Sequence, residues 1–295
     1  YYLIAKIIED FNTDRFQGLF NNSNSFGSVA ATLFAMFSAI LFKYVHDYIF
    51  NIEQKYHRQF IKYLLLCIFF LLLVALSSSR TSAAAVAGVI LLGTFLIIVK
   101  VFLRKRIKLL YLKRLIKTTM IVVIVMCIFI WPMYEVFSET ILEKFQIKIK
   151  SGDVLDQRGF IWGVTLQEAS FVGYGSNYFE KFSLGPHNTY ISLLGQFGWF
   201  AVIFFVLFLL VNLIKSVRYA INSNGDKYSF VPVLLLITFM LLSVGEGMML
   251  KVSMLGSFAC LGCLSKLDHN VVNNKLDLLN KSIHHIECHK VMEKG

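Results

Sequence analysis

Apolar residues run through this chain in long, nearly unbroken stretches separated by short polar segments. These stretches are residues 26–43, 61–78, 82–99, 118–133, 188–213, 229–245 and 248–264. Each is long enough to cross the hydrocarbon of a bilayer as a helix, and none alternates with the period of two that a membrane β-barrel requires. Because only helices and closed barrels satisfy every backbone group in lipid, we predict an all-α, polytopic transmembrane helix bundle of about seven spans.

The distribution of Lys and Arg predicts how this bundle is oriented. Segment 100–117 carries eight basic residues and no acidic one, so the positive-inside tendency places it in the cytoplasm. Counting spans from there puts three further net-positive segments on the same side: 43–62, 215–227 and 265–295. The other side receives the net-negative segments 1–25 and 134–187. We therefore expect a multi-pass protein of the cytoplasmic membrane with a cytoplasmic carboxyl-terminal tail.

The longest segment between spans is the loop 134–187, which we expect to be extracytoplasmic and partly helical. Apolar positions one helical turn apart, from Phe137 to Phe145, predict an amphipathic helix at the membrane interface. A short helix beginning near Asp156 would place on one face Arg158, Trp162 and Leu166. Apolar residues also recur at helical spacing in the tail. The chain thus divides into a membrane-embedded domain, 1–264, and a cytoplasmic amphipathic tail, 265–295.

Composition agrees with a membrane protein and limits what the positive charge can mean. Hydrophobic residues make up 57% of the chain and charged residues 16%, far from the profile of a soluble domain. The net charge of +11 lies on the segments expected to face the cytoplasm, so we interpret it as the orientation signal and expect no nucleic-acid partner. Membrane lipids are the expected surroundings. The sequence has no phosphate-cradling glycine motif for nucleotides and no Asp-x-Asp cluster for a divalent cation. The stretch with His284, His285, Cys288 and His289 could bind a metal, but we interpret it as a polar helix face and expect no cofactor and no metal.

Four residues on the predicted extracytoplasmic side are candidates for chemistry: Arg15, Arg80, Arg158 and His187. Each has an ordinary alternative, because arginines at helix ends often reach lipid headgroups and a histidine beside a span is often an interface residue. Arg80 is unusual, since it sits in a short turn, SSSRTS, on the side where basic residues are disfavoured. An anionic ligand would explain its position.

Two predicted helices direct their positive amino-terminal ends at this same side. They begin near Ser82, with Thr81 or Ser82 as the cap, and near Asn188, with Asn188 or Thr189 as the cap. Together with arginines, such ends form an anion site suited to phosphate or pyrophosphate. His187 lies at the mouth of the second helix, where the dipole favours the neutral imidazole that a general base requires.

Weaker candidates lie around these residues. Gly173 and Gly175 would let the backbone approach a ligand closely, although a flexible loop is the commoner meaning of such glycines. Tyr174 could stack on a sugar or belong to the aromatic belt of the interface. Glu246, in the turn SVGEGM before the last span, could hold an arginine or be a solvated turn residue.

The order of these pieces resembles the bacterial O-antigen ligase and Wzy-type polysaccharide polymerase superfamily. Four matches carry the resemblance. They are Arg15 with Gly18, Asn22, Asn24 and Gly27; the turn of Ser79, Arg80 and Thr81; Arg158 and Trp162 followed by Gly173 and Gly175; and His187 and Asn188 followed nine residues later by Gly198. Together they span most of residues 11–264.

The resemblance implies a metal-independent membrane glycosyltransferase of the bacterial cytoplasmic (inner) membrane, using an undecaprenyl-pyrophosphate-linked oligosaccharide as donor. His187, Arg158 and Arg80 would then be catalytic. Substrate binding would fall to Arg15, Asn188, Gly173, Gly175, Tyr174, Trp162 and Glu246. The family bundle has about a dozen helices, so further amino-terminal spans are expected. A chain-length regulator and a flippase of the same pathway are the expected protein partners.

Several functions remain open at this point. We favour an O-antigen, capsule or exopolysaccharide polymerase over an O-antigen ligase that transfers glycan to a lipid or cell-wall acceptor. The spacing of the loop arginines and glycines, and the WFA that follows Gly198, do not separate the two. A transporter or flippase of lipid-linked sugars is a further alternative, and a scaffold of a polysaccharide assembly complex is another. Transporters tend to place charges near the bilayer midplane, whereas here the charges gather at the surface.

Overall fold

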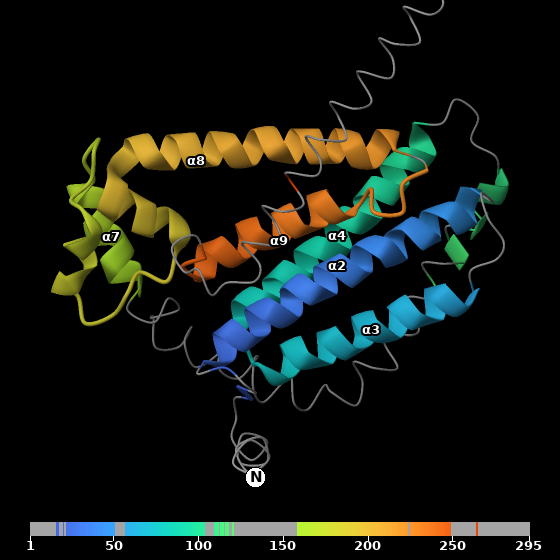
Figure 1. The fold of residues 1–295 in the computed structure, drawn as a ribbon, viewed down its shortest axis with the longest axis horizontal. Coiled ribbons are helices and arrows are strands. Elements are labelled where there is room, and N and C mark those ends of the chain that lie inside the picture. Colours follow the sequence, from blue (N-terminus) through green and yellow to red (C-terminus); the bar gives the residue numbers. More distant parts are fainter. Residues whose placement is uncertain are drawn as a thin grey trace, which may run out of the picture.

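The computed structural model describes residues 16–17, 20, 22–50, 57–103, 109–111, 113–114, 116–117, 120, 158–223, 225–248 and 264. The regular structure of these residues is entirely helical (Figure 1). Its elements are α2 (Ser23–Phe50), α3 (His57–Leu76), α4 (Arg80–Phe102), α7 (Arg158–Glu168), η2 (Ser176–Lys181), α8 (Thr189–Asn222) and α9 (Val231–Gly245). The prediction of an all-α membrane bundle is confirmed.

Four of these helices, α2, α3, α4 and α8, are long and apolar enough to cross a membrane. They correspond to the predicted spans 26–43, 61–78, 82–99 and 188–213. The predicted span 229–245 is found as the shorter apolar helix α9. Other predictions lie outside the described residues: the spans 118–133 and 248–264, the interfacial helix 137–145 and the tail helix in 265–295.

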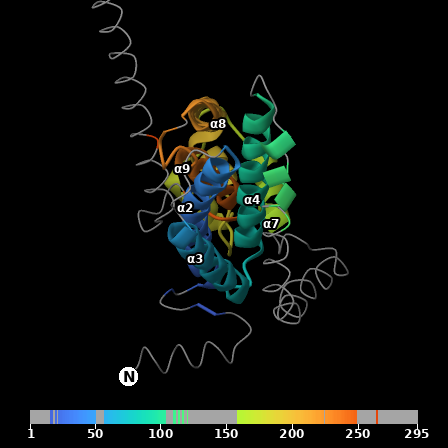
Figure 2. The same ribbon diagram turned by 90° about the vertical axis from the view of Figure 1, so that its right-hand side faces the viewer.

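Helix α2 lies at the centre of the bundle and packs against α3, α4 and α9 (Figures 1 and 2). Helix α8 packs against α9 and α4, and α7 packs against the first turns of α8. Close contacts bring together the starts of α2, α4 and α8 and the ends of α3 and α9. We call this end of the bundle, which also carries α7, the α7 end. At the opposite end, Lys100 near the end of α4 donates to the carbonyls of Ala220 (2.7 Å) and Ser223 (3.4 Å), which terminate α8.

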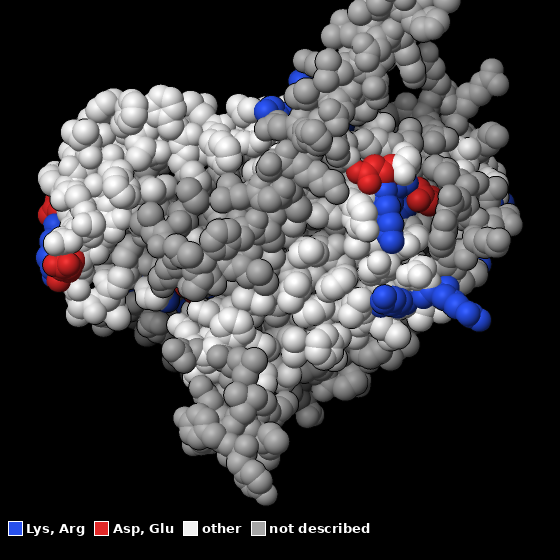
Figure 3. Space-filling model, in the orientation of Figure 1, with Lys and Arg blue, Asp and Glu red and all other residues white. Residues whose placement is uncertain are grey.

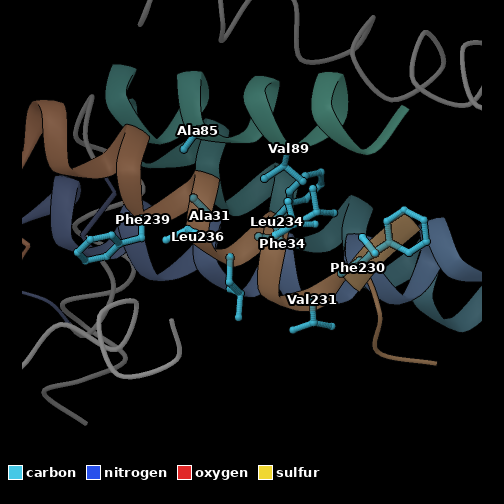
Figure 4. Packing of buried hydrophobic residues seen from close by; sticks show 14 of the residues in the cluster. Ala31, Phe34, Ala85, Val89, Phe230, Val231, Leu234, Leu236 and Phe239 are labelled. Atoms are coloured by element: carbon cyan, nitrogen blue, oxygen red, sulfur yellow. The ribbon is translucent and has the colours of Figure 1, made fainter. Parts of the chain in front are cut away.

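Small residues allow the helices of the core to approach one another closely. A Cβ atom on Gly93 of α4 would lie 2.2 Å from the Phe42 ring of α2, and one on Gly88 would lie 2.3 Å from Leu241 of α9. Figure 4 shows the side chains that fill the space between these three helices, among them Ala31, Ala85 and Leu234. Close packing through small residues is how membrane helices associate where lipid removes the hydrophobic driving force.

Charged side chains occupy a few separate places on the surface. On the face in Figure 3, the described acidic and basic residues lie together at the left edge and again in the right half, and some basic atoms also show near the upper edge. One group lies at the left edge, where Figure 1 places α7.

Candidate functional site

The Ser-Arg-Thr turn begins α4 and packs tightly at the α7 end. Helix α4 starts at Arg80, and its cap is Ser79, whose hydroxyl accepts the N–H of Ser82 at 3.4 Å. The prediction that Thr81 or Ser82 caps this helix is therefore wrong by two to three residues. A Cβ atom on Gly27 of α2 would lie 2.6 Å from the Ser77 hydroxyl, which explains why small residues fill this turn. Arg80 consequently stands in the first turn of α4, where the backbone N–H groups point outwards.

The start of α8 holds His187 in an unusual backbone conformation. Asn188, one of the two predicted candidates, is the cap of α8, and its side chain accepts the N–H of Ile191 at 3.0 Å. His187 just before it has a φ of 44°, a left-handed conformation that costs a non-glycine residue about 1–3 kcal/mol. The residue before it is fixed from α7, because the Trp162 indole N–H donates to the Pro186 carbonyl at 2.8 Å.

Glu246 faces His187 from the end of α9. Only 5% of Glu246 is exposed, so it is not a solvated turn residue. Its Oε2 lies 3.6 Å from His187 Nδ1, which makes an ion pair when the imidazole is protonated. Its Oε1 is buried without a hydrogen-bond partner in the described part of the chain. A buried carboxylate oxygen in that state is costly.

Thr189 fixes the turn that carries Glu246. Its hydroxyl donates to the Glu246 carbonyl at 2.9 Å and accepts the N–H of Met248 at 2.8 Å. The first residue of α8 is thereby tied to the turn after α9. This link sets the relative positions of His187 and Glu246, which belong to segments far apart in the sequence.

Helix α7 brings Arg158 to the same place. The Arg158 guanidinium donates to the carbonyl of Gly245 at 3.4 Å, one residue before Glu246. Gly245 in turn packs against Thr81 of α4, since a Cβ atom there would lie 2.3 Å from the Thr81 hydroxyl. The predicted helix is confirmed from Arg158 onwards. Arg158, Trp162 and Leu166 follow one another at intervals of four residues in this helix, where Leu166 is exposed and the buried residues are Ile161 and Thr165.

The structure therefore brings together Arg158, His187 and Glu246, with Asn188 and Trp162 as their supports. Arg80 begins α4 at the same end of the bundle, next to the Thr81 that contacts Gly245. Arg15 lies outside the described residues. The remaining candidates, Gly173, Tyr174 and Gly175, belong to the loop after α7 and pack further along α8.

This loop is bonded to a break in α8 at Gly198, where φ is 77°. Such a break frees backbone groups that lipid cannot satisfy. Four backbone hydrogen bonds from the loop satisfy them, joining Tyr174 to Gly195, Gly175 to Gln196, Trp199 to Ser170 and Phe200 to Phe171. A Cβ atom on Gly173 would lie 2.5 Å from Gly198 N. The close approach predicted for Gly173 is thus made to α8.

The loop also carries a charged and aromatic cluster. The Glu168 carboxylate accepts from the Tyr178 hydroxyl at 2.7 Å and from Lys181. These two bonds, that from Lys181 first, hold the pKa of Glu168 below its ordinary value. Glu168 in turn holds the pKa of Lys181 above its ordinary value. Both groups are therefore charged at neutral pH.

At the α7 end the arrangement combines three chemical capacities. The amino-terminal turns of α4 and α8 favour an anion, and the arginines add positive charge. An imidazole beside a carboxylate can accept a proton and be stabilised once it is protonated.

Sequence reasoning found the arginines but missed the roles of three supporting residues. These are Ser79 as the cap of α4, Thr189 as the link to the turn after α9, and Pro186 as the acceptor of the Trp162 indole N–H. Only the serine preceding Arg80 carried a signal, because serine is a favoured cap.

Comparison with known proteins supports the resemblance. Residues 65–206 match the family described as O-antigen ligase, a segment that includes Arg80, Arg158 and His187. No curated protein and no solved structure matches the chain. This match and the bundle of apolar helices indicate a multi-pass membrane protein that is similar to the O-antigen ligase and Wzy-type superfamily.

Proposed function

We propose that this protein is a glycosyltransferase that joins undecaprenyl-pyrophosphate-linked glycan repeat units on the extracytoplasmic face of the cytoplasmic membrane. The observation that carries the proposal is the convergence of Arg158, His187 and the buried Glu246 beside the start of α8. A base, a carboxylate and positive charge are what transfer from a pyrophosphate donor to a sugar hydroxyl requires.

The donor pyrophosphate would bind between Arg158 and Arg80. Both residues begin helices, α7 and α4, whose positive amino-terminal ends favour a bound anion. As the bond between the anomeric carbon and the pyrophosphate oxygen breaks, negative charge grows on the departing diphosphate. Guanidinium groups placed there stabilise that charge without needing a metal ion.

His187 would take the proton of the acceptor hydroxyl as its oxygen attacks the anomeric carbon. Glu246 would orient the imidazole through Nδ1, leaving Nε2 to face the acceptor, and would stabilise the imidazolium that forms. The distance of 3.6 Å is longer than a hydrogen bond and would shorten when substrate enters. The left-handed backbone of His187 supports this role, since strain of this kind gathers at functional sites.

The orientation of the bundle supports an extracytoplasmic site. The described residues at the end opposite α7 include Arg58, Lys100, Lys215, Arg218 and Lys227, which belong to segments predicted to face the cytoplasm. Under the positive-inside tendency, the α7 end would then face outwards. Labelling of single cysteines at Ser176 and at Ser223 with a membrane-impermeant reagent in whole cells tests this, because only the first should react.

A reconstituted assay tests the chemistry. Purified protein in liposomes would be given lipid-linked saccharide extracted from a strain lacking it, and products would be separated on a gel. We expect His187→Ala to lower the rate by about 10²–10⁴-fold and Arg158→Ala by about 10²–10³-fold. Arg58→Ala, an exposed arginine in the first turn of α3 at the opposite end, is the matched control. Full product from both His187→Ala and Arg80→Ala would refute the assignment.

Ligation to a lipid or cell-wall acceptor is the second candidate, because the matching family is described as O-antigen ligase. The species that accumulate in a deletion strain separate the two. Single lipid-linked repeat units indicate that a polymerase is missing. Full-length unattached chains indicate that a ligase is missing.

A further inference from the structure

The loop after α7 presents an aromatic surface that the proposed reaction centre does not use. The rings of Tyr174 and Tyr178 stack with centroids 5.3 Å apart and planes 17° apart. Tyr178 is buried, with 8% exposed, whereas Tyr174 is 55% exposed. Tyr174 therefore packs one ring face on Tyr178 and presents the other outwards. We call Tyr174, Tyr178, Glu168 and Lys181 the tyrosine platform.

The exposed ring is held in one orientation. The Tyr174 hydroxyl donates to the Glu168 carbonyl at 2.5 Å, and its backbone N–H donates to Gly195 of α8 at 3.0 Å. Beneath it, Tyr178 packs on Gly195, where a Cβ atom would lie 2.5 Å from the Tyr178 ring. A surface tyrosine fixed at both ends binds a ligand with little further loss of conformational entropy.

The surroundings of this ring favour a polar ligand. Glu168 and Lys181 form an ion pair whose two side chains are both about half-exposed, and Lys181 lies 4.2 Å from the Tyr178 ring centroid. Ser176 and Asn177, in the same loop, are exposed. Figure 3 shows acidic and basic side chains at the edge where Figure 1 places α7. Contact with a lipid tail would cost these charged groups their hydration, whereas a sugar offers C–H groups to an aromatic face and hydroxyls to the ions around it.

The platform lies at a distance from the reaction centre that helix α7 sets. The first residue of α7, Arg158, contacts Gly245 beside Glu246, and its last residue, Glu168, belongs to the platform. Ten residues of α-helix span about 15 Å. A single sugar ring bound at the centre is too small to reach the platform, but an oligosaccharide is long enough.

We propose that the tyrosine platform is a glycan-binding subsite that stacks a sugar several residues away from the bond that reacts. The inference rests on the proposed glycosyltransferase function and deepens it. The subsite selects saccharides by length and by the shape of their distal sugars. It does not contact the pyrophosphate.

Binding measurements on the full chain in nanodiscs test this proposal. The probes are free glycan, released by mild acid from the lipid-linked saccharide of the deletion strain, and undecaprenyl pyrophosphate alone. We expect Tyr174→Ala to weaken binding of the free glycan by about 3- to 10-fold and to leave binding of undecaprenyl pyrophosphate unchanged. Tyr174→Phe, which keeps the ring and loses only the hydroxyl bond to the Glu168 carbonyl, should weaken binding less than Tyr174→Ala. Arg158→Ala should weaken binding of undecaprenyl pyrophosphate and leave binding of the free glycan unchanged.

Tyr228→Ala is the matched control, because Tyr228 is 48% exposed at the opposite end of the bundle. Free glycan that binds wild type and Tyr174→Ala equally, or that does not bind wild type, overturns the subsite. If Tyr174→Ala fails to fold, Tyr174→Leu is used instead. Weaker binding of the free glycan by this variant supports the subsite, and binding equal to wild type overturns it. The proposed reaction is judged separately, since loss of product in His187→Ala does not depend on how the free glycan binds.

Discussion

Thr189 provides the sharpest test of how the fold positions the proposed base. The residue is 1% exposed, and its hydroxyl donates to the Glu246 carbonyl and accepts the Met248 N–H. Replacement by valine keeps the shape and removes both bonds. Because Met248 N also donates to the Glu246 carbonyl at 3.1 Å, neither backbone group is left wholly unpaired. We therefore expect a loss of about 1–2 kcal/mol in the free energy of unfolding.

The catalytic effect should exceed the stability effect. Without the clamp, the turn that carries Glu246 can shift relative to His187, and small displacements of catalytic groups cost about 10²-fold in rate. We expect Thr189→Val to lower kcat while KM for the lipid-linked donor changes little. Thr189→Ser keeps the hydroxyl and should retain most of the rate.

Two measurements check this prediction. Equilibrium unfolding in mixed micelles gives the stability change, and the reconstituted glycosyl-transfer assay gives kcat and KM. A Thr189→Val protein with wild-type kcat would refute the idea that the link between α8 and α9 positions the proposed base. Equal losses in Thr189→Ser and Thr189→Val would attribute the effect to packing instead.

Three further predictions address the scaffold. Gly198→Ala should destabilise the protein by about 1–3 kcal/mol, because φ is 77° and the new Cβ would lie 2.4 Å from the Gly173 backbone. Gly163→Ala is the control, because its Cβ meets open space within α7, and it should stabilise the protein by about 0.5–1 kcal/mol. Equilibrium unfolding of both variants in micelles checks the two values. Lys100→Met should cost about 1–2 kcal/mol, because it removes a cation from the carbonyls that end α8, and the same unfolding measurement checks it. The folded pKa of Glu168 is lowered, so its contribution to loop stability is complete above its unfolded pKa of about 4.3 and is lost as pH falls through the folded value. Hydrogen exchange of the loop after α7 should therefore rise at acid pH in wild type and not in Glu168→Gln.

The helices could be predicted from sequence because lipid imposes a simple rule. A run of apolar residues long enough to cross hydrocarbon must be helical, whatever surrounds it, so α2, α3, α4 and α8 follow from composition and length. Local signals also gave Asn188 as a cap and a helix from Arg158. The cap of α4 was misplaced, because serines and threonines fill the whole turn and only packing against Gly27 selects Ser79.

The partners of the site residues depend on contacts that sequence does not encode locally. Glu246 is separated from His187 by more than one complete helix, and nothing in SVGEGM indicates that its carboxylate is buried facing that imidazole. The glycine at position 173 was recognised as a place of close approach. Whether it approaches a ligand or another helix was decided only by the break at Gly198.

By itself, the sequence determined that this chain is a helical membrane protein and where its long apolar helices α2, α3, α4 and α8 lie, since those properties follow from the solvent that each segment must occupy. Only the tertiary structure decided that Arg158, His187 and Glu246 meet, and that Tyr174 stands apart from them on its own surface. These positions result from how the helices pack through small residues such as Gly88, Gly93 and Gly245. That packing depends on the shapes of all the side chains in contact at once.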